Sequence, residues 1–418
     1  MRKTSSSLLP NTIRRRIAKG LMALPAAILL SSIGMSASAA DVNTTGLAVT
    51  DDTVTVGILH SLTGTMAISE TGAQEAEKLA ISQINAMGGI LGRQIKIIQE
   101  DGASDWPTFA EKGRKLLVQD KVAAVFGAYT SASRKAVLPV FEKENGLLYY
   151  PTFYEGLEQS KNVIYSGQEA TQQILSGLDW AAKEKEAKTF YLIGSDYLWP
   201  RTSMKIARKH IENELGGTVV GEDYKPLGNT QFGSVINKIR LKKPDVIYAA
   251  VVGGSNVAWF KQLKAAGITS KKQTLMTISV TEDDVLGIGG ENLEGFYSVM
   301  KYFQSQDNPN NKAFVTAFKE MWGEDSVIGD GTQAAYLGPW LWKAAVERAG
   351  SFDIDKVVAE SEKGDIELTT APEGYVKLHQ NHHLWSKTRV GEWGKDGQAT
   401  VVYTSELIEP NPFPAGYQ

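Results

Sequence analysis

The chain has 418 residues, more than the roughly 250–300 at which a single hydrophobic core usually stops growing, so we expect two domains. Hydrophobic residues make up 42% and charged residues 22%, which excludes a largely disordered or collagen-like protein. The net charge of -3 predicts no binding to nucleic acid. The absence of cysteine excludes disulfides, thiolate metal sites, a cysteine nucleophile and a lipid-modified cysteine.

The first forty residues are typical of an export signal. They contain six basic residues and no acidic one, an apolar stretch at 21–30 and the small-residue run 36–40. That order predicts a signal peptide over residues 1–40, and Arg14-Arg15 leaves Sec and twin-arginine export both open. A membrane anchor is the alternative, but the apolar stretch is only about half of the ~20 residues that a spanning helix needs.

Removal of residues 1–40 changes the charge of the chain. It leaves 38 basic and 47 acidic residues, a net charge of -9, and no second apolar span of ~20 residues. We therefore expect a soluble periplasmic protein, and we expect it to be a monomer without a cofactor.

Strand and helix patterns alternate along the first half of the mature chain. The predicted strands are Thr53–Leu59, Gln94–Gln99, Val122–Phe126 and Leu147–Tyr150. Between them, apolar residues recur at helical spacing, for example at Ala136, Val137, Val140 and Phe141. The nearly continuous apolar run at 122–126 is typical of a strand buried on both faces of a parallel sheet. The alternation predicts βαβ units in an open α/β sheet.

A second cycle of the same kind follows residue 171. Its predicted strands are Phe190–Ile193, Thr218–Tyr224, Val246–Val252 and Thr274–Ile278, with helices near Met204–Leu215, Phe232–Ile239 and Val257–Ala265. A later helix at Tyr336–Arg348 and a strand at Val401–Tyr403 return to complete either lobe. We therefore expect two similar, discontinuous lobes joined by short hinge crossings.

Motifs of catalysis are missing from the mature chain. It has no phosphate-binding G-x-x-x-x-G-K-[ST] loop, no H-E-x-x-H and no G-x-S-x-G. His379, His382 and His383 cluster, but a third ligand for a metal is not evident, so a surface loop is the preferred interpretation. The acidic pair Asp283-Asp284 fits a helix cap or a solvent-facing site as well as acid–base chemistry. The sequence therefore predicts that the chain is not an enzyme.

Hydroxyl and aromatic residues gather where predicted strands end. In open α/β sheets these ends feed helix N-termini and form ligand sites. The three loops are Gly127–Ser131, Tyr149–Tyr154 and Gly194–Pro200. Thr130 or Ser131 can cap the following helix, which leaves backbone N–H groups for a carbonyl or carboxylate oxygen.

Several motifs resemble those of branched-chain-amino-acid-type periplasmic binding proteins of ABC transporters. They are Ser61-Leu62-Thr63-Gly64, the turn Gly88–Gly92 and the run Tyr129–Lys135. Within that family, Tyr150–Gly156 and Gly194–Thr202 are similar to the urea and short-chain-amide branch. Many urea binders carry tryptophan where this chain has Tyr129, so urea and a short-chain amide both stay open.

The resemblance implies an α/β fold of the type I periplasmic binding protein class, with two Rossmann-like lobes, a three-crossing hinge and the ligand in the interlobe cleft. The implied N-terminal lobe combines residues 53–168 with about 300–372, and the C-terminal lobe combines 169–299 with about 373–418. The implied function is a receptor that closes on its ligand and delivers it to the membrane permease subunits of an ABC transporter.

A small neutral ligand suits the residues of these loops. Urea carries a carbonyl and two amino groups without a charge, so its site needs hydroxyls, backbone groups and aromatic walls. The expected ligand-binding residues are Tyr129, Thr130, Ser131, Tyr150, Pro151, Thr152, Asp196, Tyr197 and Trp199. Ser131, Thr152 and backbone N–H groups are expected to donate to the carbonyl, and Asp196, tyrosine oxygens or backbone carbonyls to accept from the amino groups. Formamide, acetamide or branched-chain amino acids are alternative ligands, and an amide-sensing regulatory protein is the alternative from another class.

Overall fold

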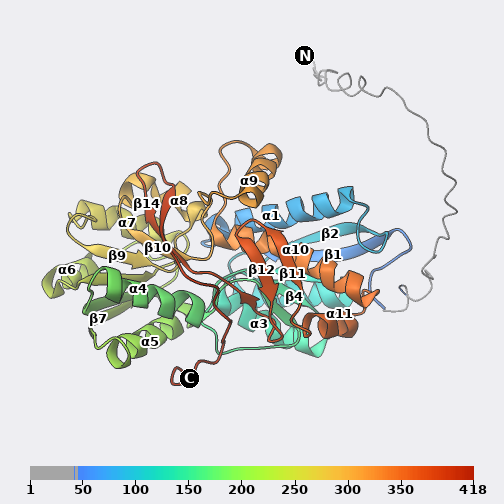
Figure 1. Cartoon of the computed structure of the whole chain (residues 1–418), viewed down its shortest axis with the longest axis horizontal. Helices are drawn as coiled ribbons and strands as arrows, with labels where there is room; N and C mark the ends of the chain where they lie inside the picture. Colours follow the sequence, from blue (N-terminus) through green and yellow to red (C-terminus); the bar gives the residue numbers. More distant parts are fainter. Residues whose placement is uncertain (1–41, 43–45) are drawn as a thin grey trace, which may run out of the picture. The chain divides into compact units, whose positions relative to one another are not determined.

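The first sheet has five parallel strands in the order β2-β1-β3-β4-β5 (Figure 1). They are β1 (Thr53–His60), β2 (Gln94–Asp101), β3 (Val125–Gly127), β4 (Leu148–Tyr150) and β5 (Val163–Tyr165). Alternate side chains enter different hydrophobic clusters, because Leu148 and Tyr150 join one cluster and Tyr149 joins the other. Strands β3, β4 and β5 are buried on both faces, as the apolar run at 122–126 predicts for the first of them, whereas the edge strand β2 is mostly half-buried.

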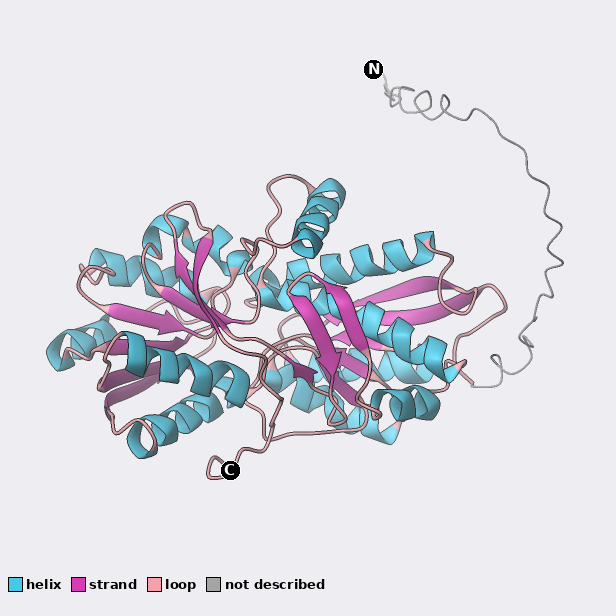
Figure 2. Cartoon of the chain, in the orientation of Figure 1, coloured by secondary structure: helices cyan, strands magenta, loops and turns pink. Residues whose placement is uncertain are grey.

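Helices cover both faces of this sheet (Figure 2). They are α1 (Ala67–Ala86), α2 (Trp106–Arg114), α3 (Ser131–Lys143), α10 (Asp330–Ala349) and α11 (Ile354–Ser361), and α2 continues as a π-helical turn through Lys115–Gln119. Helix α9 (Pro309–Trp322) packs on α1 and β11 instead. Helices α1 and α10 pack on each other, as do α2 and α3. The helix predicted at Tyr336–Arg348 is therefore the second half of α10, and it returns to the first sheet.

The second sheet has seven strands in the order β15-β14-β10-β9-β8-β6-β7. Its strands are β6 (Thr189–Ser195), β7 (Thr218–Lys225), β8 (Val246–Ala250), β9 (Thr274–Thr277), β10 (Tyr297–Met300), β14 (Arg389–Trp393) and β15 (Ala399–Thr404). Its helices are α4 (Ser176–Glu184), α5 (Leu198–Asn213), α6 (Gly233–Lys242), α7 (Ser255–Ala265) and α8 (Glu282–Ile288), with a π-helical turn at Thr171–Leu175 and a 3-10 turn at Gly290–Asn292. Strand β14 pairs antiparallel with both β10 and β15, whereas all other neighbouring strands of this sheet pair in parallel.

A small third sheet lies beside the first. It consists of β11 (Glu367–Ala371), β12 (Gly374–Leu378) and β13 (Leu384–Trp385). Val376, Leu378 and Leu384 pack in the same cluster as β1 and α10. The expected division of the lobes at about residue 372 stays a prediction, and this packing favours a boundary nearer residue 386.

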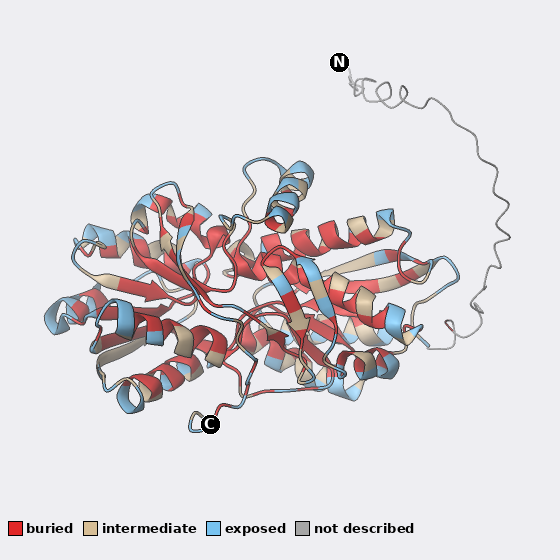
Figure 3. Ribbon diagram, in the orientation of Figure 1, coloured by how far each residue is buried: buried red, intermediate tan, exposed pale blue. Residues whose placement is uncertain are grey.

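The chain passes between the two large sheets three times. It crosses from β5 to β6, returns from β10 to α10, and crosses again from β13 to β14. This is the type I periplasmic binding protein architecture that the resemblance implies. Figure 3 shows buried strands and exposed outer helix faces in both lobes.

The structure describes Val42 and residues 46–418. It is a computed structural model, and the signal peptide expected at residues 1–40 lies outside its described residues. Among the helices that it describes, none is long and apolar enough to cross a membrane.

Two strands are shorter in the structure than the apolar runs that predict them. Strand β8 stops at Ala250, and Val251 and Val252 leave the sheet before Gly253 turns the chain with a φ of 59°. Strand β3 begins only at Val125, three residues into its apolar run. The apolar residues outside both strands are still buried.

Gly127 provides a test of how closely β1 and β3 approach. Its φ is +132°, and a Cβ there would lie 2.0 Å from the carbonyl oxygen of Leu59. Gly216 has a φ of +62° with nothing within 4 Å of a Cβ. We expect Gly216→Ala to lower the free energy of unfolding by about 1–2 kcal/mol. Gly127→Ala should cost about 1–3 kcal/mol more. Guanidinium chloride denaturation measures both variants, and equal losses would contradict the close approach.

Candidate ligand-binding site

A small cavity lies where strand ends of the two lobes face each other. Its volume is about 20 Å³. It is lined by Met66, Ser69, Tyr129, Thr130, Ser131, Thr152, Phe153, Tyr197, Trp199, Val252, Gly253 and Ser279. The first seven residues belong to the lobe of the first sheet and the others to the lobe of the second, so both lobes enclose the cavity.

Most of the expected ligand-binding residues meet at this cavity, but three do not line it. Tyr150 lies behind the wall, where its hydroxyl donates to the backbone carbonyl of Tyr129 at 2.7 Å. Pro151 precedes Thr152 without facing the cavity. Asp196 is exposed and accepts from Nε of Arg201 at 2.5 Å, so the structure gives it no place at the cavity.

Six lining residues were missed by the sequence reasoning. Val252, Gly253 and Ser279 follow strands that were predicted, so the rule of ligand sites beyond strand ends was a usable signal for them. Phe153 lies inside the motif Tyr150–Gly156, which resembles the urea and amide branch. Met66 and Ser69 sit at the start of α1, and no residue pattern marks them.

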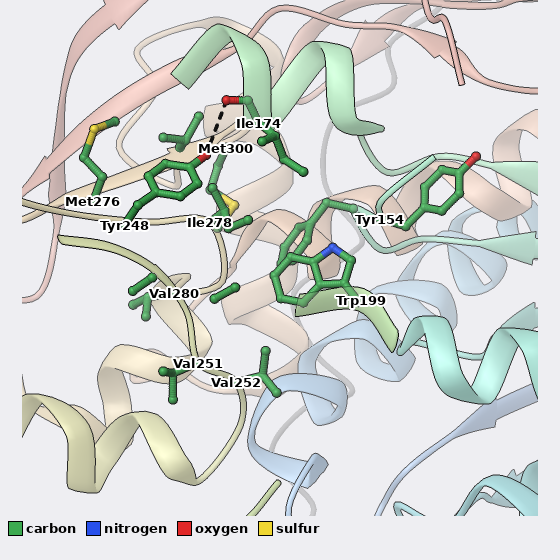
Figure 4. Close-up of a cluster of buried hydrophobic side chains, with 14 of the residues drawn as sticks. Tyr154, Ile174, Trp199, Tyr248, Val251, Val252, Met276, Ile278, Val280 and Met300 are labelled. Atoms are coloured by element: carbon green, nitrogen blue, oxygen red, sulfur yellow. Dashed lines mark hydrogen bonds between the residues drawn. The ribbon is translucent and has the colours of Figure 1, made fainter. Parts of the chain in front are cut away.

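Two buried polar groups at the cavity have no hydrogen-bond partner among the described residues. They are Oγ1 of Thr152 and Nε1 of Trp199. Burying such a group unpaired costs about 1–3 kcal/mol, so a ligand that pairs with both is stabilised by them. Figure 4 shows Trp199 beside Val252, Ile278 and Val280, which come from the second lobe. The indole ring of Trp199 packs on Phe153 of the first lobe, with ring centres 5.4 Å apart.

The start of α3 presents both backbone and side-chain groups. Thr130 is the helix cap, and its hydroxyl oxygen accepts from the Ser133 N–H at 3.0 Å. The backbone N–H groups of Ser131 and Ala132, which precede this capped group, have no intrahelical acceptor. The Ser131 hydroxyl donates to Oε2 of Glu155 at 2.6 Å and accepts from Nη1 of Arg134 at 3.2 Å.

Arg134 is a fully buried cation behind this wall. Its guanidinium contacts Glu155 at 3.3 Å and Glu158 at 2.7 Å, and it lies 4.4 Å from the centre of the Tyr154 ring. Burial alone would lower the pKa of Arg134, but Tyr150 and the two glutamates more than offset this and hold it above its ordinary value. Arg134 therefore stays charged.

The cavity itself is neutral. None of its lining side chains, all within the described part of the chain, carries a charge. Burial raises the pKa of Tyr129 far above its ordinary value, and the nearby carboxylates of Asp284 and Asp283 raise it further. Tyr129 therefore stays protonated.

Direct contacts hold the two lobes closed over the cavity. The Gly254 N–H donates to the carbonyl of Thr65 at 3.2 Å. A Cβ on Gly253 would lie 2.8 Å from the same carbonyl oxygen, so only glycine fits at this approach. The structure is thus a closed form of the cleft.

The surface loop expected for the three clustered histidines is wrong for two of them, because His382 and His383 are buried, whereas His379 is partly exposed and lies 3.2 Å from Glu409. His383 Nε2 lies 2.5 Å from the Tyr154 hydroxyl, and His382 Nδ1 lies 3.1 Å from the carbonyl of Ser160. Within residues 46–418, no group of three histidine or acidic side chains is placed to hold a metal ion.

Comparison with known proteins agrees with the two-lobed architecture. Residues 54–418 match the periplasmic binding protein domain family. The chain belongs to this family. It is a periplasmic binding protein and not an enzyme.

Known periplasmic binding proteins resemble the chain over most of its length. A Leu/Ile/Val-binding protein homolog 8 of Brucella melitensis is 24% identical, over 93% of this chain and 96% of its own. The leucine-, isoleucine-, valine-, threonine- and alanine-binding protein of Pseudomonas aeruginosa is also 24% identical, over 84% of this chain and 92% of its own. A Rhodopseudomonas palustris solute-binding protein in complex with p-hydroxybenzoic acid superimposes with a TM-score of 0.79 at 23% identity, covering 88% of this chain and all of the other.

Buried carboxylates connect the lobes of this periplasmic binding protein beside the cavity. Ser69, a cavity residue, donates to Oδ1 of Asp284 at 3.0 Å. Oδ2 of Asp283 accepts from the Gly329 N–H at 2.9 Å and from Thr332 at 3.1 Å. Burial raises the pKa of Asp283 to about 8, with the charge of Asp284 adding to the effect, and burial raises the pKa of Asp284 to about 6.

These raised pKa values predict a pH dependence of stability. The folded protein keeps protons that the unfolded chain releases near pH ~4, so its free energy of unfolding falls as pH rises from ~4 towards 8. An asparagine at position 283 cannot ionise. We therefore expect Asp283→Asn to reduce the pH-dependent fall in the free energy of unfolding by at most about 1.4 kcal/mol per pH unit. Guanidinium chloride denaturation between pH 5 and 8.5 measures the slope.

Asp245→Asn is the matched control for this measurement. Burial raises the pKa of Asp245, but hydrogen bonds from Lys188 and Thr189 lower it more, so it lies below its ordinary value. Its titration is therefore complete below pH 5, and Asp245→Asn should leave the slope unchanged. An Asp283→Asn slope equal to that of the wild type would contradict the buried, protonated carboxyl.

Proposed function

We propose that this receptor binds urea or a short-chain aliphatic amide in the closed cavity between its lobes. The observation that carries the proposal is the size and neutrality of the cavity. Its volume of about 20 Å³ is close to that needed for one buried water and far below the ~300–1,000 Å³ of sites for drug-sized ligands. Small shifts of the lining suffice for a molecule of a few heavy atoms, but not for isoleucine or hydroxybenzoate.

The free polar groups match an amide. The carbonyl oxygen needs donors, and Thr152 Oγ1, Trp199 Nε1 and the first-turn N–H groups of α3 are available. Hydroxyl oxygens such as that of Ser131 accept from amino groups. At ~1.5 kcal/mol per heavy atom, urea would gain roughly 6 kcal/mol at best, a Kd of tens of micromolar.

The names and complexes of the relatives suggest other ligands. The Pseudomonas relative is named for amino acids, and the Rhodopseudomonas structure holds p-hydroxybenzoic acid. Each of these molecules has a carboxyl group, which needs cationic or extensive hydrogen-bonding partners when it is buried. The lining residues of this cavity supply no cation. Amino acids are therefore the second candidate, supported by the relatives rather than by the cavity.

The cellular part of the proposal rests on the sequence. We propose that residues 1–40 are removed on export and that the mature protein is a soluble periplasmic monomer. It closes on its ligand and delivers it to the permease subunits of an ABC transporter. Export argues against the alternative of an amide-sensing regulator in the cytoplasm.

Calorimetric titration of ligand-free mature protein tests the proposal. We expect saturable binding of urea, formamide or acetamide with a Kd of tens of micromolar or weaker. Leucine and p-hydroxybenzoate should give no heat of binding because they exceed the cavity and bring an unpaired carboxylate. Saturable leucine binding without amide binding would overturn the assignment.

Removal of the two free donors tests the orientation of the ligand. Thr152→Val and Trp199→Phe keep shape and delete one donor each, so each should weaken amide binding by about 1–3 kcal/mol. Trp259→Phe is a matched control, because Trp259 is equally buried with an unpaired Nε1 but does not line the cavity. Calorimetry gives the affinities, and thermal unfolding checks each fold. Unchanged affinity in both cavity variants would show that the site is placed wrongly.

A further inference from the structure

The Ser131 hydroxyl has only one proton, and a carboxylate holds it. An ionised carboxylate accepts hydrogen bonds and cannot donate, so the 2.6 Å contact with Glu155 requires Ser131 to be the donor. The 3.2 Å contact with Arg134 requires Ser131 to accept, because guanidinium groups only donate. A hydroxyl has one donor and two acceptor positions. Only one acceptor position of Ser131 is left for a ligand.

The neighbouring tyrosine does not change this result. The Tyr150 hydroxyl donates its own proton to the Tyr129 carbonyl, and its oxygen also interacts with Ser131 and Arg134. The 2.6 Å contact makes Glu155 the partner of the Ser131 proton. Glu155 and Arg134 are both buried, which holds the three groups in one arrangement without solvent. The sequence-based expectation that Ser131 donates to the ligand carbonyl is therefore reversed.

We propose that the Glu155–Arg134 pair is the specificity device of the receptor, fixing Ser131 as an acceptor for a ligand N–H and excluding carboxylates. Amides and urea present an N–H at this position. A ligand carboxylate has only acceptor oxygens, so it cannot donate to the Ser131 oxygen. It is also repelled by the carboxylate of Glu155, which accepts the Ser131 proton on the other side. Glu155 and Arg134 are positioning residues, because they act through Ser131 and do not line the cavity.

Charge balance explains why the pair excludes anions so well. Arg134 and Lys135 oppose Glu155 and Glu158, so the cluster has no net positive charge to offer a ligand. Glu155→Gln and Glu158→Gln change the net charge of the cluster equally, so the difference between them reports the contact with Ser131. In Glu155→Gln the side-chain NH2 group can face Ser131 in place of the carboxylate oxygen, and the Ser131 proton is then free for a ligand carboxylate.

This proposal rests on the proposed function. Acetamide and acetate test it, because they have nearly the same shape and differ in whether an NH2 group or a charged oxygen faces Ser131. We expect wild-type protein to bind acetamide and not acetate in calorimetry. Glu155→Gln should gain at least about tenfold in acetate affinity and lose about tenfold in acetamide affinity. Glu158→Gln is the matched control, because it removes the same charge from Arg134 without touching Ser131. It should keep the wild-type preference for acetamide over acetate.

Two further variants separate positioning from a structural effect. Glu155→Asp keeps the charge and should fold, but its shorter side chain loosens the contact with Ser131. It should weaken acetamide binding about fivefold without admitting acetate. In a Ser131→Ala background, Glu155→Gln should not change acetamide affinity further, because the group through which it acts is gone.

The outcomes distinguish this inference from the proposed function. Acetamide binding with the same acetate preference in Glu155→Gln and Glu158→Gln overturns the inference and leaves the function standing. Wild-type protein that binds no amide overturns the function, whereas acetate binding gained only in Glu155→Gln still supports the positioning role. Unchanged acetamide affinity in Glu155→Asp also overturns the inference.

Discussion

The burial of the Arg134 guanidinium is the constraint on which one wall of the site depends. A cation without solvent must be paired, and breaking such a pair costs about 3–5 kcal/mol. Its partners Glu155 and Glu158 therefore draw the segment after β4 against α3. That segment also carries Thr152 and Phe153, so pairing one cation positions two residues of the cavity.

The same constraint reaches the hinge through aromatic residues. The Tyr165 hydroxyl donates to Glu158 at 2.9 Å, and the Tyr165 ring stacks on His383 with centres 4.3 Å apart. Burial lowers the pKa of His383 to about 3, so the ring is neutral and accepts from the Tyr154 hydroxyl. His383 lies just before the third crossing. The charged cluster, the cavity wall and the hinge are therefore one packed unit.

The sequence predicts the fold and the first-lobe part of the site well, because both follow from local patterns. Apolar runs mark buried parallel strands, and hydroxyl and aromatic residues after them mark the ligand-facing loops. Asp196 lies in such a loop but faces solvent, because Arg201 pairs with it on the exposed side. Ser69 and Gly253 line the same cavity from different lobes, and no local pattern encodes which residues of the two lobes face each other. Ser131 and Arg134 are three residues apart on one helix face, which was a usable signal for their contact.

The role of Glu155 follows from the helix that it faces. The N-terminus of α3 carries partial positive charge and free N–H groups, which by themselves favour an anion. Glu155 brings an internal carboxylate to the same place, 2.6 Å from Ser131, and pairs there with the buried Arg134. The carboxylate of Glu155 thereby offsets the partial positive charge of the helix N-terminus that would otherwise attract a ligand carboxylate. What remains at the cavity is a set of dipoles without net charge, and this suits a neutral polar molecule better than an amino acid or a benzoate. In the proposed site, the contact of Glu155 with Ser131 is therefore what makes the N-terminus of α3 unavailable to an anion.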